Sequence, residues 1–164
     1  MTQAAKPRRD VDLFIAVAAG GVIGALARHW VDVVFPTPAD AWPLATFIIN
    51  LSGAFILGVV IEAATAYAPD PGASNVARRL RPFLVTGVLG GYTTFSTYMV
   101  DAHGLAVANR GALAALYLFG SMAAGVALVI FGMMLGKAMF RGTRRSGEQT
   151  EADEEEIRLT EDEA

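Results

Sequence analysis

The stretch GVLGGYTTFSTYMVD, residues 87–101, combines a glycine pair, a tyrosine and a run of hydroxyl side chains inside an apolar segment. Glycines are poor helix formers, and a membrane helix tolerates one or two Ser or Thr residues because they bond back to their own helix. The four hydroxyls here belong to Thr93, Thr94, Ser96 and Thr97. Together with Gly90 and Gly91 they predict a break in a membrane helix. Broken backbone is tolerated there only where it is buried in protein or lines a wet cavity. Its freed carbonyls suit a cation, and the N-terminus of the following half-helix favours an anion.

Three further polar residues lie deep in apolar segments. Asn50, in FIINLSGAFILG, has no charged residue nearby, and an amide in hydrocarbon must find hydrogen-bond partners. It could form an interhelical hydrogen bond or act as a donor that lines a polar path. Tyr117 and Ser121 are four residues apart and share one helix face. They too could either bond a neighbouring helix or line a path.

The remaining polar residues do not form a catalytic pattern. Arg28 lies one turn from Asp32 near a membrane end, where a snorkelling or locally paired arginine is ordinary. His29, His103 and Asp101 show no metal-ligand spacing, and the chain has no cysteine. Paired carboxylates, a Ser/His/Asp set and a phosphate-binding loop are also missing, so the sequence does not predict an enzyme. The basic residues follow a membrane-protein distribution, which argues against a nucleic-acid partner.

Composition indicates the elements that must position these residues. The 164-residue chain is 54% hydrophobic and 18% charged, and the charges cluster outside four long apolar spans. Each span exceeds the roughly 20 helical residues that cross a bilayer. The predicted fold is therefore an all-α membrane protein with four transmembrane helices, at 13–34, 42–67, 82–102 and 111–136. The first span is interpreted as a helix rather than a cleaved signal, because no cleavage site with a polar mature domain follows it.

Four crossings place both termini and the 67–81 connection on one side of the membrane. Near the spans, that side carries ten basic residues, at positions 6, 8, 9, 78, 79, 81, 137, 141, 144 and 145, and the other side carries Arg28 and Arg110. The positive-inside rule then predicts cytoplasmic termini in a multi-pass protein of the cell membrane. The chain is divided into a basic cytoplasmic N-terminus (1–10), a transmembrane domain (11–137) and an acidic tail (138–164), which is predicted to be disordered.

Small residues recur four apart in three of the spans. The pairs are Gly20 and Gly24, Ala54 and Gly58, Ser121 and Gly125, and Gly132 and Gly136. Such pairs let helix backbones approach closely where the hydrophobic effect no longer drives association. They predict a tightly packed bundle. Because four helices enclose little interior, we expect a dimer with any pathway near the subunit interface.

Three motifs carry a family resemblance. GGVIGALARHW, NLSGAFILG and GGYTTFSTY together resemble the Fluc (CrcB) family of bacterial fluoride channels, over residues 11–136. The resemblance implies an antiparallel dimer of four-helix subunits, with the third helix broken at mid-membrane and two narrow pores that pass fluoride passively. Fluoride accumulates in cells because neutral HF crosses the bilayer and dissociates inside, and such a channel lets the anion leave.

The resemblance also implies roles for individual residues. A structural sodium ion, which is not transported, is held by the backbone carbonyls of Gly90 and Thr93. The fluoride pore comprises Asn50, Phe95, Ser96, Thr97, Tyr98, Tyr117 and Ser121, and Arg28 is structural. Amides and hydroxyls can donate to an anion, and an aromatic ring is positive at its edge. Tyr98 departs from the family, which usually has phenylalanine there, so its hydroxyl could contact the ion or a neighbouring helix.

The charge imbalance bears on the dimer. A chain that pairs with an inverted copy of itself must insert both ways, which needs nearly balanced loop charges. Ten basic residues against two predict insertion mainly in one orientation. The partner in an antiparallel dimer is then either the chain itself or an oppositely oriented homologue.

Two other functions remain open from the sequence. A small proton-coupled exporter of cationic or guanidinium compounds would also have four helices, but it needs an intramembrane carboxylate. Apart from Asp32 and Asp101 at the ends of their spans, Glu62 is the only candidate, and it lies toward the cytoplasmic end of the second span. A non-transporting scaffold subunit predicts that the purified protein passes no fluoride.

Overall fold

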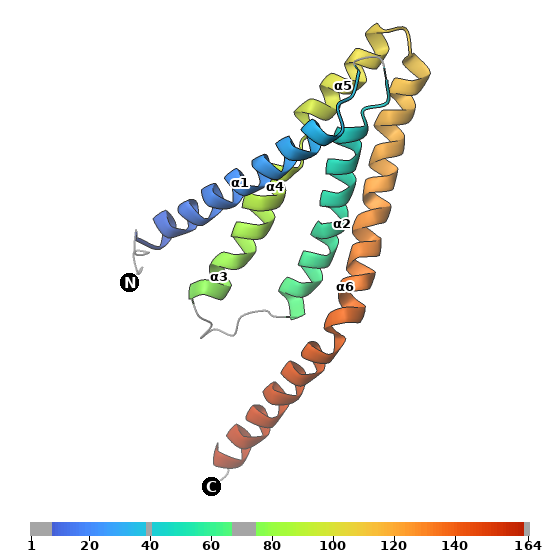
Figure 1. The fold of residues 1–164 in the computed structure, drawn as a ribbon. Coiled ribbons are helices and arrows are strands. Elements are labelled where there is room, and N and C mark those ends of the chain that lie inside the picture. Colours follow the sequence, from blue (N-terminus) through green and yellow to red (C-terminus); the bar gives the residue numbers. More distant parts are fainter. Residues whose placement is uncertain (1–7, 39–40, 67–74, 163–164) are drawn as a thin grey trace, which may run out of the picture.

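The structure is a computed structural model that describes residues 8–38, 41–66 and 75–162. Every regular element in these ranges is helical, which confirms the all-α prediction (Figure 1). The helices are α1 (Arg8–Val34), α2 (Leu44–Ala66), α3 (Asn75–Pro82), the π-helical segment η1 (Phe83–Leu89), α4 (Gly90–Tyr92), α5 (Ser96–Val107) and α6 (Gly111–Asp162).

Three of the helices are long and apolar enough to cross a membrane. The qualifying segments are Val11–Val34 in α1, Leu44–Thr65 in α2 and Gly111–Phe140 in α6. They correspond to the first, second and fourth predicted spans. The third predicted span is divided among α3, η1, α4 and α5, so it contributes no single continuous helix of sufficient length among the described residues.

The interruption of this third segment lies between α4 and α5, at residues 93–95. The backbone is still helical at Gly90, with φ −65° and ψ −33°, and becomes extended at Thr93, with φ −74° and ψ 158°. The helix therefore continues through the glycine pair that the sequence associates with the break and ends only afterwards. That the break lies at mid-membrane remains a prediction.

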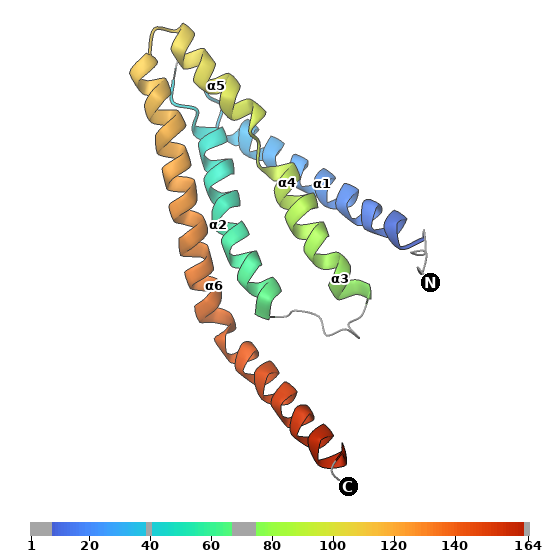
Figure 2. The same ribbon diagram turned by 180° about the vertical axis from the view of Figure 1, so that it is seen from behind.

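Other glycines of the helices bring backbones close together. A Cβ atom at Gly24 would lie on the Val88 carbonyl oxygen and 2.7 Å from the Tyr92 nitrogen, so α1 packs against η1 and α4 with no room for a side chain. On the other side of the molecule, α2 and α6 run side by side (Figures 1 and 2). A Cβ at Gly132 would lie on the Phe55 carbonyl oxygen. Close approach through small residues is the expected packing mode in membranes.

The arrangement of the helix ends fits the predicted threading of the chain. The beginning of α1, the end of α2 and the beginning of α3 lie toward one end of the bundle, and the α1–α2 and α5–α6 connections lie toward the other (Figures 1 and 2). An ion pair of 2.6 Å between Arg79 of α3 and Asp12 of α1 joins two of these ends. Which end faces the cytoplasm remains a prediction.

Helix α6 continues well beyond the other helices (Figure 1). The sequence predicts a disordered tail at 138–164, whereas the structure is helical as far as Asp162. The disorder prediction rests on the low hydrophobicity of the tail, because a segment with few apolar side chains cannot form a packed core. Low hydrophobicity does not oppose a helix, because Glu, Gln, Ala and Arg are all strong helix formers, and they dominate the segment EQTEADEEEIR at 148–158.

Candidate functional site

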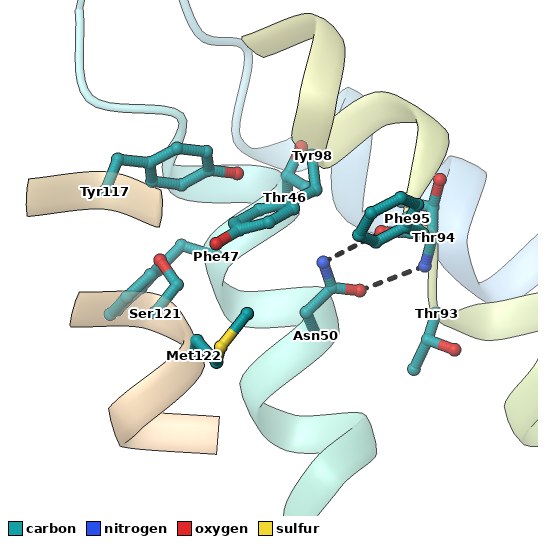
Figure 3. Close-up of a pocket in the computed structure, with 10 residues that line it drawn as sticks. All are labelled: Thr46, Phe47, Asn50, Thr93, Thr94, Phe95, Tyr98, Tyr117, Ser121 and Met122. Atoms are coloured by element: carbon teal, nitrogen blue, oxygen red, sulfur yellow. Dashed lines mark hydrogen bonds between the residues drawn. The ribbon is translucent and has the colours of Figure 1, made fainter. Parts of the chain in front are cut away.

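A cavity of about 280 Å³ lies beside the helix break (Figure 3). It is lined by Thr46, Phe47 and Asn50 from α2, by Thr93, Thr94, Phe95 and Tyr98 from the broken segment, and by Tyr117, Ser121 and Met122 from α6. The structure thus brings six predicted site residues to one place: Asn50, Thr93, Phe95, Tyr98, Tyr117 and Ser121. The sequence reasoning assigned no site role to Thr46, Phe47, Thr94 or Met122.

Asn50 pairs with the backbone of Thr94. Its Nδ2 donates to the Thr94 carbonyl and its Oδ1 accepts from the Thr94 N–H, both at 2.9 Å (Figure 3). In an unbroken helix the Thr94 N–H would donate to the Gly90 carbonyl. Asn50 therefore replaces part of the helical hydrogen bonding that is lost at the break. The interhelical bond that the sequence left open is present, and the second N–H of Nδ2 has no partner among the described residues.

Ser96 and Thr97 lie differently from the other predicted pore residues. Neither lines the cavity. Their hydroxyl oxygens lie 3.3 and 3.0 Å from the hydroxyl of Thr94. Thr94 also accepts from the Thr97 N–H at 3.2 Å, so its side chain caps the first turn of α5. This is the usual role of threonine at a helix N-terminus.

The rings of the site form an aromatic group between α5 and α6. The Tyr98 ring centroid lies 5.0 Å from that of Tyr117 and 6.1 Å from that of Phe95. Tyr98 is buried, and its hydroxyl donates to the backbone carbonyl of Leu118. The hydroxyl that distinguishes Tyr98 from a phenylalanine therefore contacts the neighbouring helix. Phe95 is 73% exposed on the single chain.

Two hydroxyls on α6 face the cavity without partners. Tyr117 is 0% exposed and Ser121 9% exposed, and neither hydroxyl has a hydrogen-bond partner among the described residues. The helix-to-helix bonds that were one interpretation of this pair are not formed. Leaving a buried hydroxyl unsatisfied costs about 1–3 kcal/mol. An ion or a water molecule in the cavity could complete their hydrogen bonding.

Sequence reasoning missed a second polar contact at the end of this cavity. The Thr46 hydroxyl donates to Asp101 Oδ2 at 2.6 Å. Thr46 also lines a second cavity of about 210 Å³, whose wall includes Asp32, Thr97 and Asp101. Thr46 lies one turn before Asn50 and so on the same helix face, which was an available signal. Its partner, 55 residues away, was not foreseeable from local pattern.

The predicted sodium ligands can be tested against these contacts. The Gly90 carbonyl loses its usual helical donor because the Thr94 N–H bonds Asn50. The Thr93 carbonyl accepts one long bond, 3.4 Å, from Arg28 Nη1. Unwound backbone carbonyls are the oxygen ligands that coordinate sodium in membrane proteins, so the chemistry of these two carbonyls fits this ion. One chain supplies too few of them to enclose it.

Fold and site together define a class: a small, multi-pass helical membrane protein with a cavity at a broken helix whose largely apolar wall holds a few hydroxyl and amide groups. The family model for CrcB-like protein, Camphor Resistance (CrcB), matches residues 15–133, and the chain belongs to this family. The match does not include the acidic end of α6.

Relatives extend over the same region. The chain is 41% identical over 122 residues to "Fluoride-specific ion channel FluC 3" of Streptomyces avermitilis, a match covering 74% of this chain and 57% of that relative. It is 37% identical over 131 residues to "Fluoride-specific ion channel FluC" of Chlorobium phaeobacteroides, covering 80% and 97% of the two chains. The protein of the same name from Rhodopseudomonas palustris is 40% identical over 129 residues, covering 78% and 96%. The family resemblance drawn from the sequence is therefore confirmed.

Proposed function

We propose that this protein is a fluoride-specific ion channel that lets fluoride leave the cytoplasm passively. One observation carries the proposal: the Tyr117 and Ser121 hydroxyls, which have no partner among the described residues, line one cavity at a helix break together with Asn50, whose Nδ2 uses one of its two N–H groups for Thr94. Fluoride holds its water strongly, so a pore must replace that water with hydrogen-bond donors. Hydroxyl and amide groups are such donors. The names of the relatives agree with fluoride as the permeant ion.

The helix break also supports a dimer. Phe95 is 73% exposed on the single chain, next to backbone that a bilayer tolerates only when it is covered. An antiparallel second subunit, either a copy of this chain or an oppositely oriented homologue, would cover it. The carbonyls of Gly90 and Thr93 from both subunits would then meet and hold a structural sodium ion. The ion would neutralise the carbonyl dipoles where the two breaks meet.

The one-sided charge favours the homologue as partner. With ten basic residues on one side and two on the other, the termini belong in the cytoplasm. Reporter proteins fused to the C-terminus measure this: a cytoplasmic reporter should give nearly all the signal. Equal signals from a cytoplasmic and an external reporter would instead show dual insertion and favour the homodimer.

The exporter alternative is less well supported. It depends on Glu62, which does not line the cavity at the break. Its Cβ lies instead at the α2–α6 packing contact, 2.8 Å from where a Cβ on Gly136 would be. A carboxylate in that position is poorly placed to exchange a proton for a substrate bound among Asn50, Tyr117 and Ser121.

Flux from liposomes tests the function directly. Liposomes that contain the purified protein and are loaded with fluoride should release the fluoride once a potassium ionophore prevents a membrane potential from building up. Liposomes loaded with chloride should retain it. The release should not depend on a proton gradient and should persist in Glu62→Gln. Absence of fluoride flux would favour the scaffold alternative. Flux that needs a proton gradient and is lost in Glu62→Gln would favour the exporter.

Substitutions at Tyr98 separate its ring from its hydroxyl. Tyr98→Phe loses the bond to the Leu118 carbonyl and should reduce stability by about 1 kcal/mol, with fluoride flux close to that of the parent. Tyr98→Ile also loses the ring next to Tyr117 and Phe95, and its flux should fall strongly. Thermal unfolding and liposome efflux measure the two effects. If Tyr98→Ile conducts like the parent, the ring has no role in permeation.

A further inference from the structure

The amide of Asn50 has two ends of opposite character, and only one of them suits an anion. Its carbonyl oxygen would repel an anion and its amino group would attract one. An unrestrained asparagine can turn its amide by 180° and exchange these ends. A site that must present a donor therefore needs something that fixes the orientation of the amide.

The backbone N–H and carbonyl of Thr94 provide this restraint. Its N–H holds Asn50 Oδ1 and its carbonyl holds one N–H of Nδ2, each at 2.9 Å (Figure 3). A turned amide would face oxygen with oxygen and N–H with N–H, and both bonds would be lost. In the fixed orientation, Oδ1 is occupied by Thr94. The donor that Asn50 has left for the cavity is one N–H, whereas Oδ1 points to the Thr94 N–H at the break (Figure 3).

The side chain of Thr94 holds this peptide in place. Thr94 is only 8% exposed. Its hydroxyl accepts from the Thr97 N–H at 3.2 Å and donates to the Thr97 hydroxyl at 3.0 Å. These two bonds join the extended residues of the break to the first turn of α5. Without them, Phe95 still accepts from the Met99 N–H of α5 and Asn50 still bonds the Thr94 backbone, but nothing joins the Thr94 side chain to the first turn of α5, and the Thr94 backbone is held less firmly.

We propose that Thr94 is a positioning residue that determines anion specificity by fixing which end of the Asn50 amide faces the cavity. The role rests on the proposed function, because it deepens the account of the same site. It assigns Thr94 no contact with the ion. Its hydroxyl orients its own backbone, the backbone orients the Asn50 amide, and Asn50 thereby turns its amino group rather than its oxygen to the ion.

Variants of Thr94 test the proposal in the full-length protein. Thr94→Val keeps the shape and removes the hydroxyl. Fluoride flux in liposomes should fall about tenfold if the free energy of one helix cap no longer favours the oriented Asn50 amide. The fluoride-to-chloride flux ratio should fall by a similar factor. Thr94→Ser keeps the hydroxyl and should restore both. Thr65→Val is the matched control, because the Thr65 hydroxyl bonds only the Ile61 carbonyl of its own helix, and flux and ratio should stay at parental values.

Hydrogen exchange of the Asn50 side chain provides a readout that does not depend on flux. By NMR, with the signal assigned by its loss in Asn50→Asp, one of the two amide protons should be protected in the parent and in Thr94→Ser. Thr94→Val should lose that protection. If Thr94→Val does not fold, Thr94→Ala removes the same hydroxyl with less bulk. Parental protection and parental flux ratio in the hydroxyl-free variant would overturn the proposal. If the parent passes no fluoride, the proposed function fails, and the exchange experiment still decides whether Thr94 positions Asn50.

Discussion

Gly24→Ala will separate α1 from the broken segment, with a loss of stability of about 3 kcal/mol. A Cβ at Gly24 would clash with the Val88 carbonyl oxygen and lie 2.7 Å from the Tyr92 nitrogen and 3.0 Å from the Gly91 carbonyl carbon. These are backbone atoms, which cannot change rotamer to make room. The expected loss therefore lies at the upper end of the roughly 1–3 kcal/mol typical of overpacking. Thermal unfolding in detergent measures it, and fluoride flux should fall with it because α4 leads directly into the break.

Gly21→Ala is the matched control for this variant. Gly21 lies three residues earlier on α1, and a Cβ there meets nothing within 4 Å. The substitution should leave unfolding and flux unchanged, or raise stability slightly, since alanine is the better helix former by about 1 kcal/mol. Equal behaviour of Gly24→Ala and Gly21→Ala would mean that α1 does not pack on the broken segment as described.

Asn50→Leu will abolish fluoride flux and destabilise the protein by about 2–5 kcal/mol. It removes both bonds to Thr94 and leaves that residue's N–H and carbonyl without partners. Each buried group left unsatisfied costs about 1–3 kcal/mol. The cavity also loses a donor. Liposome efflux and thermal unfolding report the two losses separately.

Asn50→Asp distinguishes structural support from anion attraction. A carboxylate can still accept from the Thr94 N–H, but it cannot donate to the Thr94 carbonyl, and it adds a negative charge to the cavity wall. We expect a smaller loss of stability than in Asn50→Leu and an equally complete loss of fluoride flux. Substantial fluoride flux through the aspartate variant would show that Asn50 does not face the permeating anion.

Hydropathy predicts four spans, and three of them are confirmed as long apolar helices. These three were predictable because length and apolar composition are local properties of the sequence. The third segment shows where local reasoning stops. The sequence associates the break with Gly90 and Gly91, but the helix ends at Thr93, where Asn50 offers an alternative partner for the backbone of Thr94. That partner lies 44 residues away. The same limit applies to Thr46 and Asp101, whose bond spans 55 residues.

The sequence predicts which residues line the site more readily than it predicts the contacts that their side chains make. The family resemblance implies pore roles for Asn50, Phe95, Tyr98, Tyr117 and Ser121, and the fold brings them to one cavity, as a shared path requires. It does not reveal that the nearby hydroxyls of the TTFST run bond one another, because that depends on the turn geometry at 94–97. The helical end of α6 differs from the predicted disorder for a related reason: helix propensity and burial are separate properties, and composition reports mainly on burial.

Thr46 belongs to the walls of both cavities, so a single substitution there acts on both of them. A substitution there changes the free energy of an occupant on either side at once, and it also releases Asp101 from its bond. Residues that share a partner show non-additive effects of about 0.5–3 kcal/mol. The effect of changing Thr46 therefore cannot be apportioned to one compartment from single variants. Double-mutant cycles that pair Thr46 with Asn50 on one side and Thr97 on the other give the two interaction energies separately.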